Sequence, residues 1–236
     1  MNEYNIINCM DTDVPIIQLQ NVGKTFRKHK RPVLVLNDIN LEIKRTSFTV
    51  LSGLSGSGKT TLLKIIGGFE KASSGKVLFN GEDISGLSNE KLTAFRRKNV
   101  GMIFQDYYLD ENLTFRENIE LPAMFADIKE EEIAARTKEL VEGTDLAERL
   151  NHYPDEISGG QAQRAAILRA VYLKPDLILA DEPTSNIDDL NAKMVLDNLK
   201  ELQQKGHTIL LASHDARVLE YADAVIKMTD GKVICD

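Results

Sequence analysis

Two kinds of hydrophobic pattern alternate along this chain. Short runs of apolar and β-branched residues predict buried strands at Ser47–Leu51, Val100–Phe104, Asp176–Ala180 and Thr208–Ala212. Between these runs lie longer segments in which apolar residues recur every three or four positions, as on one face of a helix. Because strands that alternate with helices pair in parallel, the pattern predicts an α/β fold with a mostly parallel sheet.

The two ends of the chain predict antiparallel strands instead. Near the N-terminus, the strand patterns Ile16–Val22 and Val33–Ile43 flank the basic segment Lys24–Arg31, which we expect to be a hairpin loop with a positive tip. Near the C-terminus, Ala224–Met228 and Lys232–Ile234 flank an Asp-Gly pair, a frequent hairpin turn. We therefore expect an N-terminal antiparallel β subdomain and a C-terminal hairpin beside the parallel sheet.

A helical region interrupts the α/β pattern in the middle of the chain. Glu117–Ala126 and Glu130–Gly143 carry apolar residues at helical spacing among many charges, with no strand between them. We interpret residues 107–165 as an α-helical subdomain inserted in the core, although two ordinary covering helices would give the same pattern. Residues 1–15 are expected to be a flexible polar leader, and residues 16–236 to form one domain.

The glycine-rich stretch after the strand at Ser47–Leu51 carries the most specific chemistry. It matches G-x-x-x-x-G-K-[ST], the pattern of a phosphate-binding loop (P-loop). Strand, glycine-rich turn and helix are in the order that lets backbone N–H groups and a helix N-terminus converge on one anion. Lys59 can reach the β- and γ-phosphates of a nucleotide, and the Thr60 hydroxyl can bind Mg²⁺. The loop residues expected to bind the nucleotide are Gly53, Leu54, Ser55, Gly56, Ser57, Gly58, Lys59, Thr60 and Thr61.

Polar side chains stand where three of the predicted strands end. They are Gln105, Asp181, Glu182 and His214. Ligands of open α/β sheets collect at the carboxyl ends of the strands, so these positions favour a site. Adjacent strand residues point to opposite sides, so one of the two carboxylates can hold Mg²⁺ through water while the other faces an attacking water. A solvated strand end and a structural histidine are the alternatives.

Two further features are less specific. Ser158 precedes Gly159, Gly160 and Gln161 at the start of a helical segment, where an exposed group of N–H donors would suit an anion. A plain loop-to-helix junction gives the same pattern. Phe26, in the basic segment, could offer a face on which a purine stacks, or could be a minor hydrophobic anchor.

Composition narrows the classes of function. Of 236 residues, 36 are acidic and 29 basic, which gives a net charge of −7. This sign disfavours binding to phosphate backbones over a wide face, so we expect no nucleic-acid partner. Cys9 and Cys235 have no metal-ligand spacing, as is usual in a reduced, cytosolic setting. The chain has no signal-peptide pattern and no uninterrupted membrane-spanning stretch, so a membrane role would come through a partner.

In order and spacing, these residues resemble the ATP-binding subunits of ABC transporters, over nearly the whole chain from Ile16 to Ile234. The motifs similar to that family are the P-loop as Walker A, Gln105 as the Q-loop glutamine, Ile157–Gln161 as the signature, Leu177–Glu182 as Walker B, Ser185–Asp188 as the D-loop, His214 as the switch histidine and Phe26 as the adenine-stacking aromatic. Within the family, Ala180–Thr184, Gly206–Thr208 and Glu117–Pro122 are similar to the lipoprotein-release and macrolide- or peptide-export branch.

The resemblance implies hydrolysis of ATP with Mg²⁺. It implies catalytic roles for Glu182, His214, Gln105 and Lys59, metal ligation by Thr60, Gln105 and Asp181, and ATP binding by Phe26, the P-loop, Ser158, Gly159, Gly160 and Gln161. It also implies a homodimer on ATP binding, an integral membrane transporter subunit as partner, and a cytoplasmic, peripheral position on the inner face of the cell membrane.

The chain departs from the family pattern at a few positions. Ile157, Ala162 and Phe26 stand where leucine, glutamine and tyrosine are more usual. Thr46–Ser47 stands where a Gly-Glu pair is common, which leaves the turn before the P-loop strand unexplained.

Three functions fit the sequence. The first is an ATPase motor that energises export or extraction of a substrate. The second is a non-transporting ABC ATPase that regulates a cell-envelope or cell-division complex. The third is a nucleic-acid or ribosome-associated ABC protein, which the single nucleotide domain and the acidic balance disfavour.

Overall fold

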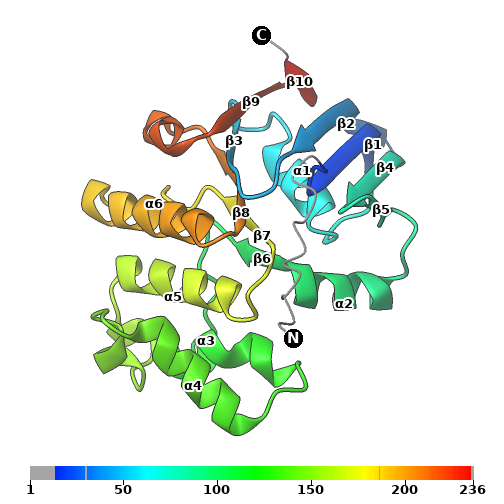
Figure 1. Cartoon of the computed structure of the whole chain (residues 1–236). Helices are drawn as coiled ribbons and strands as arrows, with labels where there is room; N and C mark the ends of the chain where they lie inside the picture. Colours follow the sequence, from blue (N-terminus) through cyan, green and yellow to red (C-terminus); the bar gives the residue numbers. More distant parts are fainter. Residues whose placement is uncertain (1–13, 30, 186, 235–236) are drawn as a thin grey trace, which may run out of the picture.

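The computed structural model describes residues 14–29, 31–185 and 187–234, so nearly all of the predicted leader at residues 1–15 lies outside the described residues. The chain forms two sheets with helices packed around them (Figure 1). The six-stranded sheet has the order β10-β9-β3-β8-β7-β6, and the four-stranded sheet has the order β2-β1-β4-β5. The strands are β1 (Ile17–Lys28), β2 (Arg31–Ile43), β3 (Phe48–Ser52), β4 (Ser74–Phe79), β5 (Glu82–Asp83), β6 (Val100–Ile103), β7 (Leu177–Asp181), β8 (Thr208–Ser213), β9 (Ala224–Thr229) and β10 (Lys232–Ile234). The α-helices are α1 (Lys59–Ile66), α2 (Asn89–Asn99), α3 (Phe115–Met124), α4 (Glu130–Val141), α5 (Gly159–Val171) and α6 (Asp189–Gln204).

The six-stranded sheet is parallel except for β10, which confirms the predicted α/β class. Successive side chains of its central strands point to opposite faces of the sheet. All residues of β7 and β8 are buried, so both faces are covered. In β7, Leu177 and Leu179 pack on the side of α1, whereas Ile178 and Ala180 pack on the side of α5 and α6. The continuous apolar runs of the sequence are the consequence of this two-sided burial.

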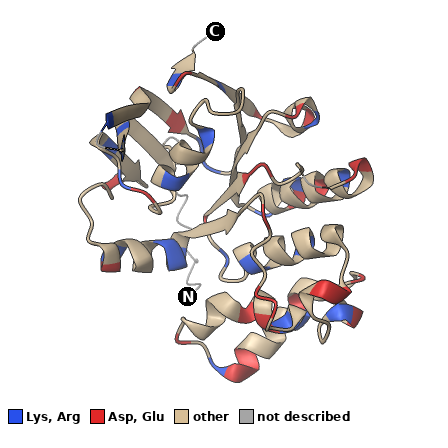
Figure 2. Cartoon of the chain, turned by 180° about the vertical axis from the view of Figure 1, so that it is seen from behind, with Lys and Arg blue, Asp and Glu red and all other residues tan. Residues whose placement is uncertain are grey.

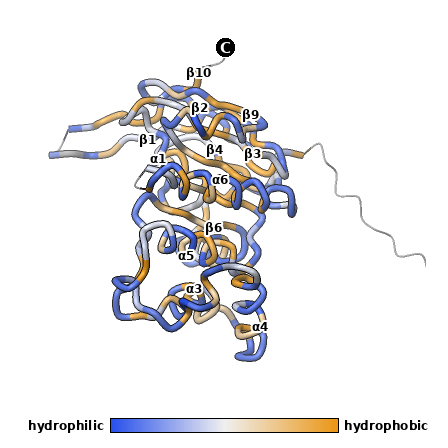
Figure 3. Tube along the Cα trace, turned by 90° about the vertical axis from the view of Figure 1, so that its left-hand side faces the viewer, coloured by the Kyte–Doolittle hydropathy of each residue, from blue (hydrophilic) through white to orange (hydrophobic). Residues whose placement is uncertain are grey.

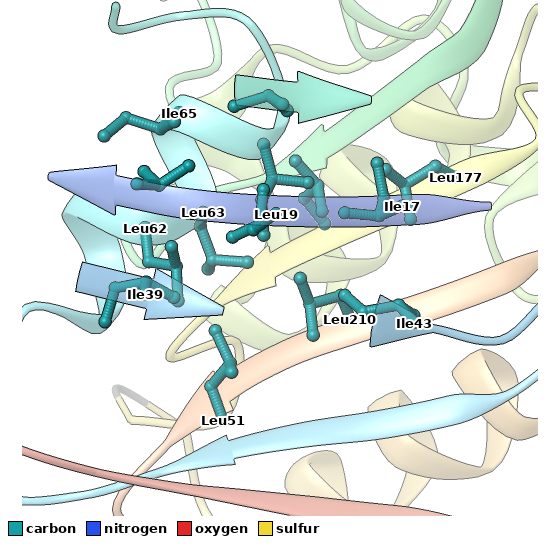
Figure 4. Close-up of a cluster of buried hydrophobic side chains, with 14 of the residues drawn as sticks. Ile17, Leu19, Ile39, Ile43, Leu51, Leu62, Leu63, Ile65, Leu177 and Leu210 are labelled. Atoms are coloured by element: carbon teal, nitrogen blue, oxygen red, sulfur yellow. The ribbon is translucent and has the colours of Figure 1, made fainter. Parts of the chain in front are cut away.

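The four-stranded sheet covers α1 and closes the larger core cluster (Figure 4). Ile17 and Leu19 of β1 contact the cluster that also holds Leu62 and Leu63 of α1, and all four side chains are at most 2% exposed. Burial of each such side chain stabilises the fold by about 1.5–3 kcal/mol. The helix that follows the P-loop is therefore held between the two sheets.

The basic segment Lys24–Arg31 is not the loop that we predicted. Strands β1 and β2 continue through it, with Phe26 paired to Val33 and Lys28 paired to Arg31, so strand pairing covers most of the segment. Backbone pairing along the two long strands overrides the low strand propensity of lysine. The result is a long hairpin that projects from the body of the molecule (Figure 3).

Helices α3 and α4 form a separate layer beyond α5 (Figure 1). Helix α3 begins with a capping box, because the Thr114 hydroxyl accepts from the Glu117 N–H and the Glu117 carboxylate accepts from the Thr114 N–H. The apolar faces of α3 and α4 pack with α5 around Phe115 and Tyr172. The two predicted helices are thus confirmed, and no helix in the described part of the chain is long and apolar enough to cross a membrane.

The turn before β3 contains a β-branched residue in a left-handed conformation. Thr46 has φ 54°, a region in which residues other than glycine are disfavoured. Its backbone is held there, because its N–H donates to Thr208 Oγ1 (3.0 Å) and its carbonyl oxygen accepts from Gln203 Nε2 (2.6 Å). This conformation explains why a glycine is common at this position in the resembling family.

Replacement of Thr46 by glycine should stabilise the protein by about 1 kcal/mol, because a left-handed β-branched residue costs about 1–2 kcal/mol and the exposed side chain makes little packing. The measurement is the free energy of unfolding in urea. Thr25→Gly, at a position of β1 that pairs with Leu34 of β2, is the matched control and should lose stability. Equal losses in both variants would contradict this account of the turn.

Candidate active site

The carboxyl ends of β3, β8 and β7 meet at one edge of the six-stranded sheet. Ser52 at the end of β3 is paired with Ser213 of β8, and Asp181 at the end of β7 is paired with Ala212. A cleft of about 360 Å³ lies at this edge. Its lining residues are Val35, Ser55, Gly56, Gly58, Lys59, Thr60, Thr61, Gln105, Glu182 and His214. Parts of the chain that are far apart in sequence are therefore gathered around the P-loop.

The P-loop is wrapped tightly around one lysine. Gly56 and Gly58 have φ of 82° and 102°, the left-handed region that favours glycine. Lys59 is only 5% exposed, and its ammonium donates to the carbonyl oxygens of Gly53 (2.7 Å) and Leu54 (3.1 Å). Helix α1 has no side-chain N-cap, so its first N–H groups remain available to an anion at the cleft.

Asp181 faces the first turn of α1. Its Oδ1 accepts a hydrogen bond from the Thr60 hydroxyl at 2.9 Å, and the aspartate is 7% exposed. Burial raises the pKa of Asp181; the hydrogen bond from Thr60 lowers it in part, and the neighbouring Glu182 raises it further. A carboxylate and a hydroxyl, both ligands that Mg²⁺ accepts, are thus adjacent at the cleft.

Glu182 turns away from Asp181, although not for the reason that we predicted. Strand β7 ends at Asp181, and Glu182 has φ 48°, so a left-handed turn rather than strand alternation separates the two carboxylates. Glu182 Oε1 lies 2.9 Å from Nδ1 of His214, and Oε2 accepts from the Ser213 hydroxyl at 3.2 Å. Lys59 Nζ lies 3.8 Å from Oε1. The glutamate is therefore oriented by two polar side chains from the end of β8.

The segment after Gln105 is tied to helix α5. Both terminal nitrogens of Arg169 donate, one to the carbonyl oxygen of Tyr107 and one to that of Tyr108, each at 2.7 Å. Burial lowers the pKa of Arg169, but a guanidinium stays protonated at neutral pH. Sequence reasoning missed this contact, because a basic residue late in a helix carries no sign of which carbonyl groups it will reach.

Phe26 lies on the hairpin, outside the residues that line the cleft. Its ring is 37% exposed, and Lys24 Nζ lies 4.6 Å from the ring centroid. Lys24 is buried and pairs with Glu70 at 2.6 Å, so one position of the predicted positive loop faces inward. Val35, on the neighbouring strand, does line the cleft, which places the base of the hairpin at its wall.

Ser158, Gly159 and Gly160 are not among the residues that line the cleft of their own chain. Ser158 caps α5 as predicted, with its hydroxyl accepting from the Gln161 N–H (3.3 Å). The two glycines are not both exposed, however, because Gly160 is buried, and a Cβ there would lie 2.1 Å from Asn191 Oδ1. A larger residue at that position would therefore displace the Asn191 side chain of α6.

Comparisons with known proteins were made for the whole chain. The sequence profile of the ABC transporter family matches residues 36–185. The macrolide export ATP-binding/permease protein MacB of Vibrio parahaemolyticus is 40% identical over 94% of this chain but only 34% of its own length, so the chain spans about a third of such relatives. An uncharacterised ABC transporter ATP-binding protein of Methanocaldococcus jannaschii is 40% identical over 93% of this chain and 98% of its own length.

A solved structure has the same fold. It is the dimeric, post-hydrolysis state of an ATP-binding cassette bound to ADP and phosphate, with a TM-score of 0.84 and 36% identity over 93% of this chain and 97% of that one. Together with the P-loop, the strand-end carboxylates and the helical region, these matches show that the chain belongs to the ABC transporter family, as an ATP-binding cassette.

Proposed function

We propose that this protein hydrolyses ATP with Mg²⁺ and drives export or extraction of a substrate through a separate membrane subunit. The observation that carries the proposal is that Lys59 and Glu182 line one cleft beside the P-loop, where Thr60 holds Asp181 by a hydrogen bond. The export direction rests on the MacB relatives, which are named as joined ATP-binding and permease proteins. The chain would then act on the inner face of the cell membrane.

Each group in the cleft has a chemical task. The P-loop N–H groups and Lys59 would bind the phosphates, and Phe26 would stack on the adenine. Glu182 would take a proton from the attacking water, while Ser213 and His214 hold its carboxylate in one orientation. His214, at the cleft wall, would also reach the γ-phosphate.

The residues at the cleft fit a Mg²⁺ ion that is bound jointly by the protein and by the phosphates of a nucleotide. Thr60 and Asp181 are already hydrogen-bonded to each other, and no group of three His, Cys, Asp or Glu side chains within the described ranges could hold a metal alone. Mg²⁺ ordinarily takes one or two protein carboxylates plus phosphate oxygens, so two protein ligands with Gln105 nearby suffice. Bound there, the ion would neutralise charge on the phosphates during transfer.

A second copy would complete the site. Ser158 and Gly159 lie at a helix N-terminus, but they do not line the cleft of their own chain. In a head-to-tail dimer, the P-loop of one chain and Ser158–Gln161 of the other would enclose each ATP, as the dimeric cassette in the comparison supports. ATP would close the pair and hydrolysis would release it.

Closure would reach the membrane subunit through the helical subdomain, which we assign to residues 107–165. Arg169 connects α5, which begins at the signature, to the backbone just after Gln105, so motion of one shifts the other. The exposed apolar side chains near this contact are Tyr108, Met124 and Phe125, at 65%, 58% and 72% exposure. Leu109 and Phe115 pack into the subdomain core, so they would not dock a partner.

The regulatory alternative uses the same cleft and differs only in its partner. A membrane subunit with a large extracytoplasmic domain encoded beside this chain would favour export.

Glu182→Gln should keep ATP binding and reduce steady-state hydrolysis by about 10²-fold or more, because the amide cannot accept the proton from water. Lys59→Ala should instead lose tight binding. Equilibrium ATP binding and phosphate release are the measurements, with exposed Glu131→Gln as the matched control. Undiminished hydrolysis in the Glu182→Gln protein would show that Glu182 does not accept the proton from the attacking water.

Asp181→Asn should keep the stability of the protein but remove its ability to bind Mg²⁺ with the nucleotide. Because burial raises the pKa of this carboxyl group, its contribution to the stability of the nucleotide-free protein is fully present below the ordinary pKa of aspartate and is lost as pH rises through the raised value. The neutral amide should therefore leave the nucleotide-free protein at least as stable at pH 7. With ATP bound, however, addition of Mg²⁺ should no longer raise the melting temperature of the variant. Asp127→Asn, at an exposed position, is the control. Full Mg²⁺-dependent stabilisation in Asp181→Asn would contradict the ligand assignment.

Tyr108→Glu and Met124→Glu should leave the hydrolysis rate of the isolated chain intact and weaken its association with the membrane subunit by about tenfold or more, because buried apolar anchors dominate such interfaces. Co-purification after co-expression with the membrane subunit encoded nearby is the measurement. Leu219→Glu, 40% exposed on another face, is the control. Retained association together with full partner-stimulated turnover would place the docking surface elsewhere.

A further inference from the structure

The tip of the β1–β2 hairpin is the most concentrated positive charge in an acidic chain. Four of the five residues from Arg27 to Arg31 are lysine or arginine, and the chain as a whole has a net charge of −7. The hairpin projects from the body, with its Lys and Arg segments blue in Figure 2. We call Arg27 and Arg31, which lie near the end of this hairpin, the basic tip.

The charges of Arg27 and Arg31 are not neutralised by an ion pair within the described part of the chain. Arg27 and Arg31 are exposed, and no carboxylate among the described residues forms an ion pair with either. Lys24, two positions before Phe26, shows the contrast, because it is buried and paired with Glu70 at 2.6 Å. Concentrated, unpaired charge of one sign attracts a partner of opposite sign.

The position of the basic tip relative to the nucleotide indicates which partner of opposite charge it contacts. Phe26, on which we place the adenine, directly precedes Arg27, and the same hairpin supplies Val35 to the wall of the cleft. The tip therefore extends beyond the adenine. A second chain that closes over the nucleotide meets this tip at the edge of the interface.

The matching charge lies just before the signature. Asp155 and Glu156 are exposed in the short helical turn Pro154–Glu156, and Ser158 follows two residues later. Glu156 already accepts from the Tyr153 N–H at 2.7 Å, whereas no Lys or Arg of the described chain pairs with Asp155. Three residues of chain span at most about 10 Å. Asp155 thus lies within about 10 Å of Ser158, and the basic tip lies similarly close to Phe26.

We propose that the basic tip of one chain pairs with Asp155 and Glu156 of a second copy when ATP closes the dimer. The inference rests on the proposed function, because it needs one ATP to touch Phe26 of one chain and Ser158 of the other. Two chains of net charge −7 repel each other at long range, and each also brings the negative charge of its ATP. A local contact of opposite sign offsets that repulsion and orients the two chains head to tail.

The test uses the full chain carrying Glu182→Gln, so that ATP is held without turnover, and measures the dimerisation constant by sedimentation. Arg27→Glu with Arg31→Glu should weaken ATP-dependent dimerisation about tenfold, and Asp155→Lys about threefold, as expected for exposed charges at an interface. The three changes together should recover most of the loss. Lys91→Glu with Lys98→Glu on α2 alters net charge equally and is the matched control.

Each other outcome overturns the proposal in a recognisable way. An equal loss in the α2 control would reveal a general effect of net charge. An equal loss of ADP affinity in the monomer would mean that the tip binds nucleotide. Unchanged dimerisation with loss of binding to phosphatidylserine-containing vesicles would assign the tip to lipid. If the parent protein binds ATP but never dimerises, the proposed dimer itself fails, and this inference fails with it.

Discussion

The parallel pairing of β3, β8 and β7 fixes the positions of the P-loop, Glu182 and His214 at the cleft. Because Ser52 is level with Ser213, and Asp181 is level with Ala212, the chain leaves all three strands at the same height. The P-loop, His214 and Glu182 are the segments that follow. A slip of one residue would turn each strand over and direct Asp181 away from Thr60. The two-sided apolar core specifies the register and therefore also specifies the site.

The same arrangement leaves the site divided between two parts of the molecule. Lys59 and Glu182 line the cleft, whereas Ser158 caps helix α5, which packs against Asn191 and the helical region. Arg169 links that helix to the backbone after Gln105. A ligand that binds both parts at once can therefore change their relative position, which is the requirement for converting binding into motion.

Local signals made much of this predictable. Glycine spacing located the P-loop, and apolar runs located the buried strands, because both patterns depend on residues adjacent in sequence. Contacts between distant segments could not be predicted in this way. The inward turn of Lys24 depends on Glu70, the extent of the hairpin depends on cross-strand pairing, and the left-handed Glu182 depends on Ala212 and Ser213 of β8. Thr46 lies between these cases, since its departure from the family pattern marked an unusual turn without giving the conformation.

The central claim is that one ATP contacts the P-loop of one chain and the signature of another. Two proteins test it most directly, one carrying Ser55→Cys and the other Ser158→Cys, both with Glu182→Gln and with Cys9 and Cys235 replaced by serine. The two are mixed under mild oxidation, and the disulfide-linked pair is measured by non-reducing electrophoresis. The account predicts a mixed disulfide dimer that forms with ATP and Mg²⁺ and is nearly absent with ADP. Saturating ATP without such a dimer would contradict it.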